Sequence, residues 1–119
     1  MISKKMVVMA IIEKVEKEYD DAQIRTPLIE GYDKPARIGL KGKAEEGYVP
    51  DMVLRRKDAT ELYCVELEKD YQVNKWRLFS LYTMKEKGNL HIVAPEAHLP
   101  QLKEALNENS INARILYFS

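Results

Sequence analysis

Apolar residues recur at helical spacing in three stretches of the chain. The first stretch follows Ser3, a good helix-capping residue, and predicts a helix over residues 3–20. The second begins after Asp70 and is expected to end at Gly88, which is the predicted cap. The third predicts a short helix over residues 99–106.

Five other stretches are typical of β-strands, because their residues alternate between apolar and polar or form short apolar runs bounded by turn residues. They cover residues 36–41, 48–56, 61–68, 90–94 and 113–118. Residues 21–35 contain Pro27, Gly31 and Pro35, which predicts a loop. The element order αβββαβαβ predicts an α/β fold with helices on both faces of a mixed sheet, whose fourth strand enters parallel through a helical crossover.

The composition indicates one ordered domain over residues 1–119. Of the 119 residues, 45% are apolar and 32% are charged, without a linker, repeat or low-complexity tract. The single cysteine, Cys64, excludes an internal disulfide or a structural zinc cluster. The apolar run over residues 6–12 is shorter than the roughly 20 residues that a membrane span needs, and no cleavage site follows it. We therefore expect a soluble, cytoplasmic protein without a membrane partner.

Charge is balanced over the chain but not along it. The 19 lysines and arginines equal the 19 aspartates and glutamates in number, so the net charge gives no steering toward nucleic acid. Basic residues nevertheless gather between residues 34 and 57, where they would form a phosphate-binding surface or a solvated face. The residues of this region expected to contact nucleic acid are Lys41, Lys43, Arg55 and Arg56.

Three carboxylates are candidates for a divalent-metal site. Asp51 follows Pro50 on one predicted strand, and Glu66 and Glu68 alternate along the next, so the two glutamates share a strand face. Antiparallel pairing of these strands would bring Asp51 beside both glutamates, and gathered carboxylates need a cation to offset their repulsion. Hard oxygen ligands of this kind suit Mg²⁺ or Mn²⁺. The alternative is that these side chains are solvated on exposed strands.

In order and spacing, these elements resemble the PD-(D/E)XK nuclease superfamily. The resemblance covers most of the chain and rests on Pro50-Asp51, Glu66-Leu67-Glu68-Lys69, the helix with Lys75, Trp76 and Tyr82, and the apolar strand over residues 90–95. It implies a restriction endonuclease-like, three-layer α/β/α fold with a mixed central sheet.

The resemblance also implies roles for individual residues. Asp51 and Glu66 would be the metal ligands, with the backbone carbonyl of Leu67 as a further ligand, and Glu13 or Glu16 would be an auxiliary acidic residue on the first helix.

This chain departs from the family at the third motif position, where the usual lysine is replaced by Glu68. Glu68 would bind a second metal or accept the proton of the attacking water. Alternatively, Lys75 would supply the missing lysine, because Lys75, Phe79 and Tyr82 share one side of the predicted second helix.

The leading functional hypothesis is Mg²⁺- or Mn²⁺-dependent hydrolysis of DNA by a small endonuclease or resolvase-like enzyme. A homodimer is expected, since one compact active site cuts one strand. The second hypothesis is a noncatalytic member of the same fold that binds DNA or assembles with a replication or mobilisation factor, because the motif lysine is absent. The motif pattern is also similar to the core of plasmid replication-relaxation proteins. A third hypothesis, a plain α/β scaffold, predicts no metal affinity.

Overall fold

The computed structural model describes residues 1–40 and 46–119. The elements are α1 (Lys4–Glu18), β1 (Gln23–Arg25), β2 (Met52–Arg56), β3 (Ala59–Val65), α2 (Val73–Lys85), β4 (Leu90–Pro95), the 3-10 turn η2 (Glu96–His98), α3 (Leu99–Glu108) and β5 (Arg114–Phe118). This order confirms the predicted αβββαβαβ arrangement. No helix in the described part of the chain is long and apolar enough to cross a membrane.

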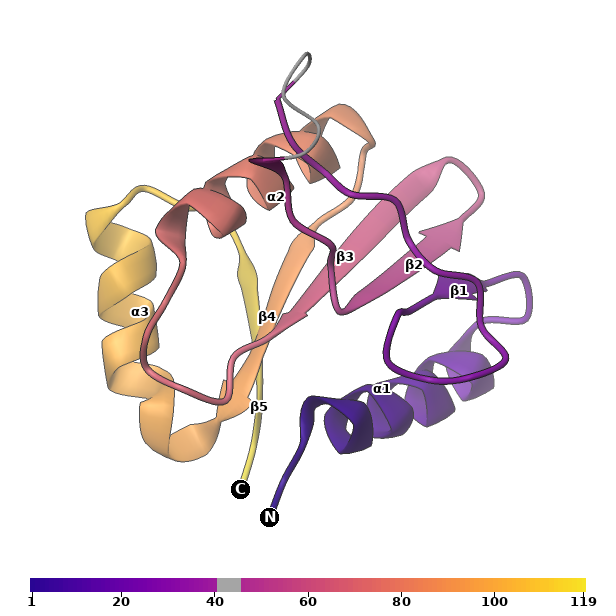
Figure 1. The fold of residues 1–119 in the computed structure, drawn as a ribbon, viewed down its shortest axis with the longest axis horizontal. Helices are drawn as coiled ribbons and strands as arrows, with labels where there is room; N and C mark the ends of the chain where they lie inside the picture. Colours follow the sequence, from indigo (N-terminus) through magenta and orange to yellow (C-terminus); the bar gives the residue numbers. More distant parts are fainter. Residues whose placement is uncertain (41–45) are drawn as a thin grey trace.

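The five strands form one mixed sheet in the order β1-β2-β3-β4-β5 (Figure 1). The first three strands pair antiparallel, because β2 and β3 are joined by a tight turn in which Lys57 has a φ of 50°. The last three pair parallel, because α2 and α3 carry the chain back across the sheet between them. The predicted parallel entry of the fourth strand is therefore confirmed.

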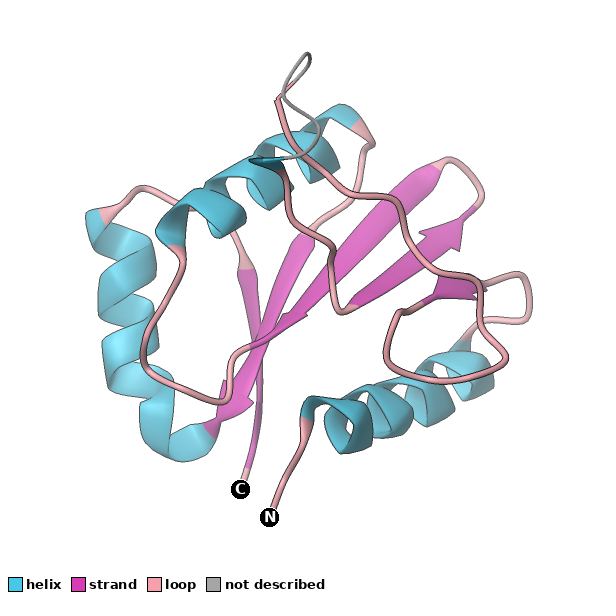
Figure 2. Ribbon diagram, in the orientation of Figure 1, coloured by secondary structure: helices cyan, strands magenta, loops and turns pink. Residues whose placement is uncertain are grey.

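Helices cover both faces of the sheet, as Figure 2 shows. Alternation along β3 explains the two layers, since Leu62 and Cys64 face α2 and α3 whereas Tyr63 and Val65 face α1. The core on the α1 side includes Val8, Ile12, Val15, Met52 and Leu54, and the core on the α2 side includes Trp76, Phe79, Leu90, Ile92 and Leu102. The three-layer α/β/α arrangement follows from this division of apolar residues.

The start of α1 agrees with the sequence. Ser3 is the N-cap, and its Oγ accepts a hydrogen bond from the backbone N–H of Met6 at 3.2 Å. The helix ends two residues before the predicted boundary, at Glu18 rather than Asp20.

The first strand of the sheet is not the one that the sequence predicted. Strand β1 lies inside the predicted loop and pairs Ile24 with Leu54 of β2. In the predicted strand over residues 36–41, the described residues contribute one isolated bridge, between Ile38 and Tyr48. Ile38 packs on the α2-side core instead of joining the sheet edge. Tertiary packing thus overrides the local alternation of apolar and polar residues in this stretch. Lys41, at its end, lies outside the described residues.

Strands β2 and β3 are both shorter than predicted, which changes the geometry of the carboxylates. Strand β3 ends at Val65, so Glu66 and Glu68 follow the strand instead of lying on it. The backbone N–H of Glu66 still bonds to the carbonyl of Val93 at 2.8 Å, and the chain then leaves the sheet toward α2. The expectation that Glu66 and Glu68 share a strand face is therefore wrong.

The end of α2 is closed by Lys87 and Gly88 together. The N–H of Gly88 bonds to the carbonyl of Thr83 at 2.8 Å and that of Lys87 to Met84 at 3.4 Å, which is the Schellman pattern. Lys87, with a φ of 61°, holds the left-handed position predicted for Gly88. Gly88 is needed for a different reason, because a Cβ there would clash with the carbonyl oxygen of Thr60.

These two positions give substitutions of opposite effect. Gly88→Ala is predicted to lower the free energy of unfolding by about 2 kcal/mol, because the backbone of β3 must move away from the new methyl group. Lys87→Gly is predicted to be neutral or to raise it by up to about 1 kcal/mol, because glycine adopts the left-handed conformation without a Cβ penalty. Urea-unfolding midpoints of the two variants and the wild type measure both effects. An unchanged midpoint for Gly88→Ala would contradict the close contact with Thr60.

A candidate site at the ends of β2 and β3

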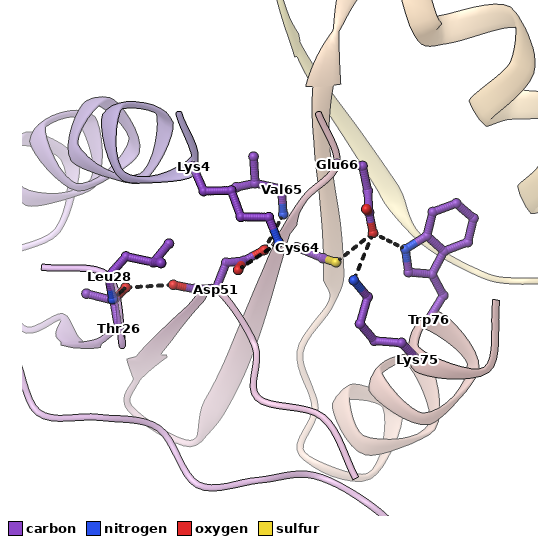
Figure 3. Close-up of polar contacts among 9 residues, drawn as sticks. All are labelled: Lys4, Thr26, Leu28, Asp51, Cys64, Val65, Glu66, Lys75 and Trp76. Carbon is purple, nitrogen blue, oxygen red and sulfur yellow. Dashed lines mark hydrogen bonds and ion pairs between the residues drawn. The ribbon is translucent and has the colours of Figure 1, made fainter. Parts of the chain in front are cut away.

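Polar side chains from all three layers meet at one end of the sheet (Figure 3). Asp51 immediately precedes β2 and Glu66 immediately follows β3, and the antiparallel pairing of these strands brings the two positions to the same edge. Lys4 reaches this edge from α1, and Lys75 and Trp76 reach it from α2. The expectation that Asp51 and Glu66 occupy the same end of the sheet is confirmed.

Asp51 is held by its backbone as well as by its side chain. Its Oδ2 accepts the N–H of Val65 at 2.7 Å, and its Oδ1 lies 3.3 Å from Nζ of Lys4. Its carbonyl accepts the hydroxyl of the buried Thr26 at 2.7 Å. Pro50 directly before it is fully buried. The carboxylate is therefore fixed in position before any ligand binds.

Glu66 is buried, and one of its oxygens receives three donors. Nε1 of Trp76 donates to Oε2 at 2.8 Å, the thiol of Cys64 donates to the same oxygen at 3.1 Å, and Nζ of Lys75 lies 3.2 Å from it. The side chains of Lys75 and Glu66 are only 11% and 9% exposed, so this ion pair is shielded from solvent. All three of these contacts involve Oε2, and none of them involves Oε1.

The protonation states in this cluster follow from burial and charge. Burial alone would lower the pKa of Lys75, but nearby negative charge, including that of Glu66 and of Asp51, and the hydrogen bond to Glu66 outweigh burial and raise that pKa above 10.5. Burial, together with Glu66, raises the pKa of the Cys64 thiol well above 9.0. At neutral pH Lys75 is thus an ammonium group and Cys64 a neutral thiol, so neither acts as a base.

Tyr71 adds a buried hydroxyl beside this cluster. Its ring lies 5.0 Å from that of Trp76, and within the described residues its hydroxyl oxygen is buried without a hydrogen-bond partner. Burial raises the pKa of Tyr71, and the charge of Glu66 raises it further. A buried hydroxyl of this kind needs a partner, which a ligand or its bound water would supply.

The donor set fits one hard cation better than a dedicated metal cage. Residues 1–40 and 46–119 contain no group of three or more histidine, cysteine, aspartate and glutamate side chains that could hold a metal ion. Mg²⁺, however, keeps several waters and takes one or two carboxylates, which Asp51 and Glu66 provide. The orphaned hydroxyl of Tyr71 is a further group to which a metal-bound water could bond.

Other residues expected at the site lie apart from it. Glu68 is exposed in the bend after β3. Glu13 is exposed on α1, where its carboxylate lies 3.6 Å from Nζ of Lys17. Leu67 is half-buried and packs on the α1-side core, next to Glu66 in the chain. The structure therefore joins Glu66 to Lys75 and places Asp51 at the same edge of the sheet, whereas the two other acidic side chains lie apart.

The basic residues expected to contact nucleic acid separate in the fold. Arg55 and Arg56 are neighbours on β2 and point to opposite faces of the sheet. Arg55 donates to the hydroxyl of Thr60 at 2.8 Å on the α2 side, whereas the guanidinium of Arg56 lies 3.8 Å above the ring of Tyr19 at the end of α1. Lys41 and Lys43 lie outside the described residues.

Sequence reasoning missed several members of the cluster. Lys4 and Thr26 are far from Asp51 in sequence, and nothing local marks them as its partners. No role at the site was assigned to Cys64 from the sequence, yet its thiol donates to Glu66. The available signal was its position two residues before Glu66, which puts both on the α2 side of the chain.

A second buried polar pair lies on the other face of the sheet. Nε2 of His91 lies 2.8 Å from Oε1 of Glu61, and the His91 ring stacks on Tyr63 at 4.5 Å. Burial lowers the pKa of His91, and the hydrogen bond to Glu61 opposes this effect. Asn89 also donates to Glu61, whereas Nδ1 of His91 is buried without a hydrogen-bond partner among the described residues.

Comparisons with known proteins return no match to this chain among family models, curated proteins or solved structures.

Removal of the Lys75 ammonium is predicted to leave a buried, uncompensated carboxylate. Lys75→Met should lower the free energy of unfolding by about 3 kcal/mol at pH 7. Adding Glu66→Gln should recover part of this loss, because the amide is neutral. Urea unfolding of both single variants and the double variant measures the coupling, with the exposed Lys103→Met as the matched control. Purely additive effects would contradict a direct Lys75–Glu66 interaction.

The contribution of the Lys75 charge to the free energy of unfolding changes with pH in a defined direction. The folded-state pKa of Lys75 is raised above the ordinary value of 10.5, so its stabilising charge is fully present below that pH and is lost as pH rises through the raised value. The stability difference between wild type and Lys75→Met should therefore be constant from pH 7 to about pH 10 and shrink above it. Chemical denaturation across this range tests the direction, and a difference that shrinks already below pH 9 would contradict it.

Proposed function

We propose that this chain is a metal-dependent phosphodiesterase that acts on DNA, with Asp51 and Glu66 as ligands of one Mg²⁺ or Mn²⁺ ion. The observation that carries the proposal is the contact between Lys75 and Glu66, in which Nζ of Lys75 lies 3.2 Å from Oε2 of Glu66. It gives the cluster an aspartate, a glutamate and a lysine, although the third motif position carries Glu68. The resemblance to PD-(D/E)XK nucleases supports the same assignment.

The two carboxylates have different surroundings, which suits them to different tasks. Asp51 is fixed by the N–H of Val65, while its other oxygen faces the partly exposed Lys4. Lys4 is 42% exposed at its side chain and can move aside at little cost. Glu66 is held by the hydrogen bond from Trp76 to its Oε2, so its Oε1 would be the atom that binds the metal. When bound, the metal ion would polarise a nonbridging phosphate oxygen and lower the pKa of a bound water.

Lys75 contributes positive charge and not a base. Because its pKa is raised, its ammonium group donates hydrogen bonds at neutral pH. It therefore orients the attacking water or stabilises negative charge that develops on the phosphate. Because Glu68 is exposed in the bend after β3 and lies apart from the site, proton acceptance from the water falls to bulk solvent.

Among the basic residues that the structure describes, Arg55 has the position that best suits contact with DNA on the α2 side. Lys41 and Lys43 lie outside the described residues and remain candidates for such contact from the sequence alone. A homodimer would place two such sites on the two strands of a duplex, since one compact site cuts one strand.

One observation favours the noncatalytic alternative. Each carboxylate already has a lysine partner, Lys4 for Asp51 and Lys75 for Glu66, so the charges of the cluster balance without a cation. In that case the fold would bind DNA or assemble with a replication or mobilisation factor, and the cluster would fix the ends of β2 and β3. This reading predicts DNA binding that EDTA does not change, and the plain scaffold predicts neither binding nor cleavage.

Cleavage of supercoiled and branched DNA tests the proposal. Wild type with Mg²⁺ or Mn²⁺ should nick these substrates, and Asp51→Asn and Glu66→Gln should each lower the rate at least about a hundredfold, because each removes a ligand charge. Lys75→Met should also reduce cleavage, whereas Lys75→Arg should retain part of it. Gel analysis of time courses measures the rates.

The matched control is Glu104→Gln, which removes a carboxylate from an exposed position on α3. This variant should cleave DNA at the wild-type rate. A variant is compared with wild type only if its circular-dichroism spectrum shows that it is folded. Folded wild type that cleaves neither substrate with either metal would overturn the enzyme assignment. Equal cleavage by Asp51→Asn and wild type would show that any nuclease activity arises elsewhere.

A further inference from the structure

A second site lies on the α2-side face of the sheet, away from the carboxylates. It is a cavity of about 430 Å³ between β1, β2, the segment over residues 35–39 and the later part of α2. Arg55 and Asp51 are four residues apart along extended chain, which puts the backbone of Arg55 about 13 Å from that of Asp51. Its volume is in the range of pockets that hold small organic ligands.

Three arginines from three different segments line this cavity. They are Arg25 on β1, Arg37 on the 35–39 segment and Arg55 on β2, and the lining residues that the structure describes include no aspartate or glutamate. Residues distant in sequence thus bring like charges into one cavity, where their mutual repulsion is relieved when an anion binds.

Hydrogen bonds orient two of these guanidinium groups. Nη1 of Arg37 donates to the carbonyl of Gly47 at 2.7 Å, and Nη1 of Arg55 donates to the hydroxyl of Thr60 at 2.8 Å. Each guanidinium has five N–H donors, so others are left for a ligand. Glu86 lies 3.7 Å from Arg55 and offsets part of one charge, which leaves the cavity cationic.

Apart from Gln23 and Thr60, the side chains in the rest of the lining are apolar or aromatic. Val53 and Leu62 form the sheet surface below the arginines, and Tyr82 of α2 closes one side. Inorganic phosphate would meet the arginines but would leave this surface uncovered. A ligand that satisfies both parts carries an anionic group joined to a flat, largely apolar ring.

We propose that this cavity binds a nucleoside phosphate, with the phosphate on the arginines and the base against Tyr82 and the apolar sheet surface. Arginine matches phosphate oxygens through paired N–H donors, and bases stack on aromatic side chains. Gln23, which also lines the cavity, offers an amide to the edge of the base. The ligand is either a free nucleotide or a nucleotide of single-stranded DNA. The proposal is independent of cleavage, because binding here needs no metal.

Isothermal titration of the full chain with 5′-dAMP, in EDTA, tests this site. Wild type should bind saturably, and Arg25→Gln and Arg55→Gln should each bind about tenfold more weakly, because each removes a charged donor pair. Arg25 is exposed on a short strand, so its variant keeps the test valid if Arg55→Gln fails to fold. Arg77→Gln, at an exposed position on α2, is the matched control and should bind like wild type.

Further probes separate the parts of the ligand. Deoxyadenosine and inorganic phosphate should each bind more weakly than 5′-dAMP, and higher salt should weaken binding of the nucleotide. Single-stranded DNA is supported as the source if a tetranucleotide binds more tightly than 5′-dAMP and loses the same factor of affinity in Arg25→Gln. A free nucleotide is supported if the tetranucleotide and 5′-dAMP bind with equal affinity. Absence of saturation with 5′-dAMP, wild-type affinity in Arg25→Gln, or equal affinity for phosphotyrosine would overturn the proposal.

Discussion

The buried carboxylate of Glu66 depends on two donors from the start of α2, and the surrounding structure is arranged to supply them. An unpaired buried carboxylate costs several kcal/mol, so Glu66 is tolerated only with the hydrogen bond from Trp76 and the charge of Lys75. Both donors lie in the first turns of α2, which must therefore pack against the end of β3. This constraint explains why the chain leaves the sheet after Val65 and why Trp76 is fully buried.

Asp51 imposes a similar constraint on the other face. Its side chain accepts the N–H of Val65, and its carbonyl accepts the hydroxyl of Thr26, so the residues before β2 are tied to β3 and to the segment after β1. Lys4 adds a contact from the start of α1. The candidate site is thus built from all three layers. Its lysine partners balance the carboxylate charges, which makes the same geometry compatible with a cation or with a closed structural cluster.

The cationic cavity arises from a different feature, the short antiparallel β1–β2 pair. Arg25 and Arg55 both point to the α2 side because their strands pair in register, and the segment over residues 35–39 brings Arg37 over them. The alternation of β2 sends Arg56 to the opposite face, where it stacks on Tyr19. A run of basic residues in the sequence therefore becomes two separate surfaces in the fold, with different partners and different ligand chemistry.

The sequence by itself determined the element order, the capped first helix, the two apolar faces of the sheet and the placement of Asp51 and Glu66 at one edge, because these follow from local periodicity and from antiparallel pairing. It indicated Lys75 through helical spacing, but it misplaced the first strand and put Glu68 on a strand. Only the tertiary structure decided that β3 ends at Val65, that Ile24 and not Ile38 joins the sheet, and that Lys4 and Thr26 reach Asp51. These features depend on contacts between residues far apart in sequence, whose free energy exceeds the small local preferences that a pattern records.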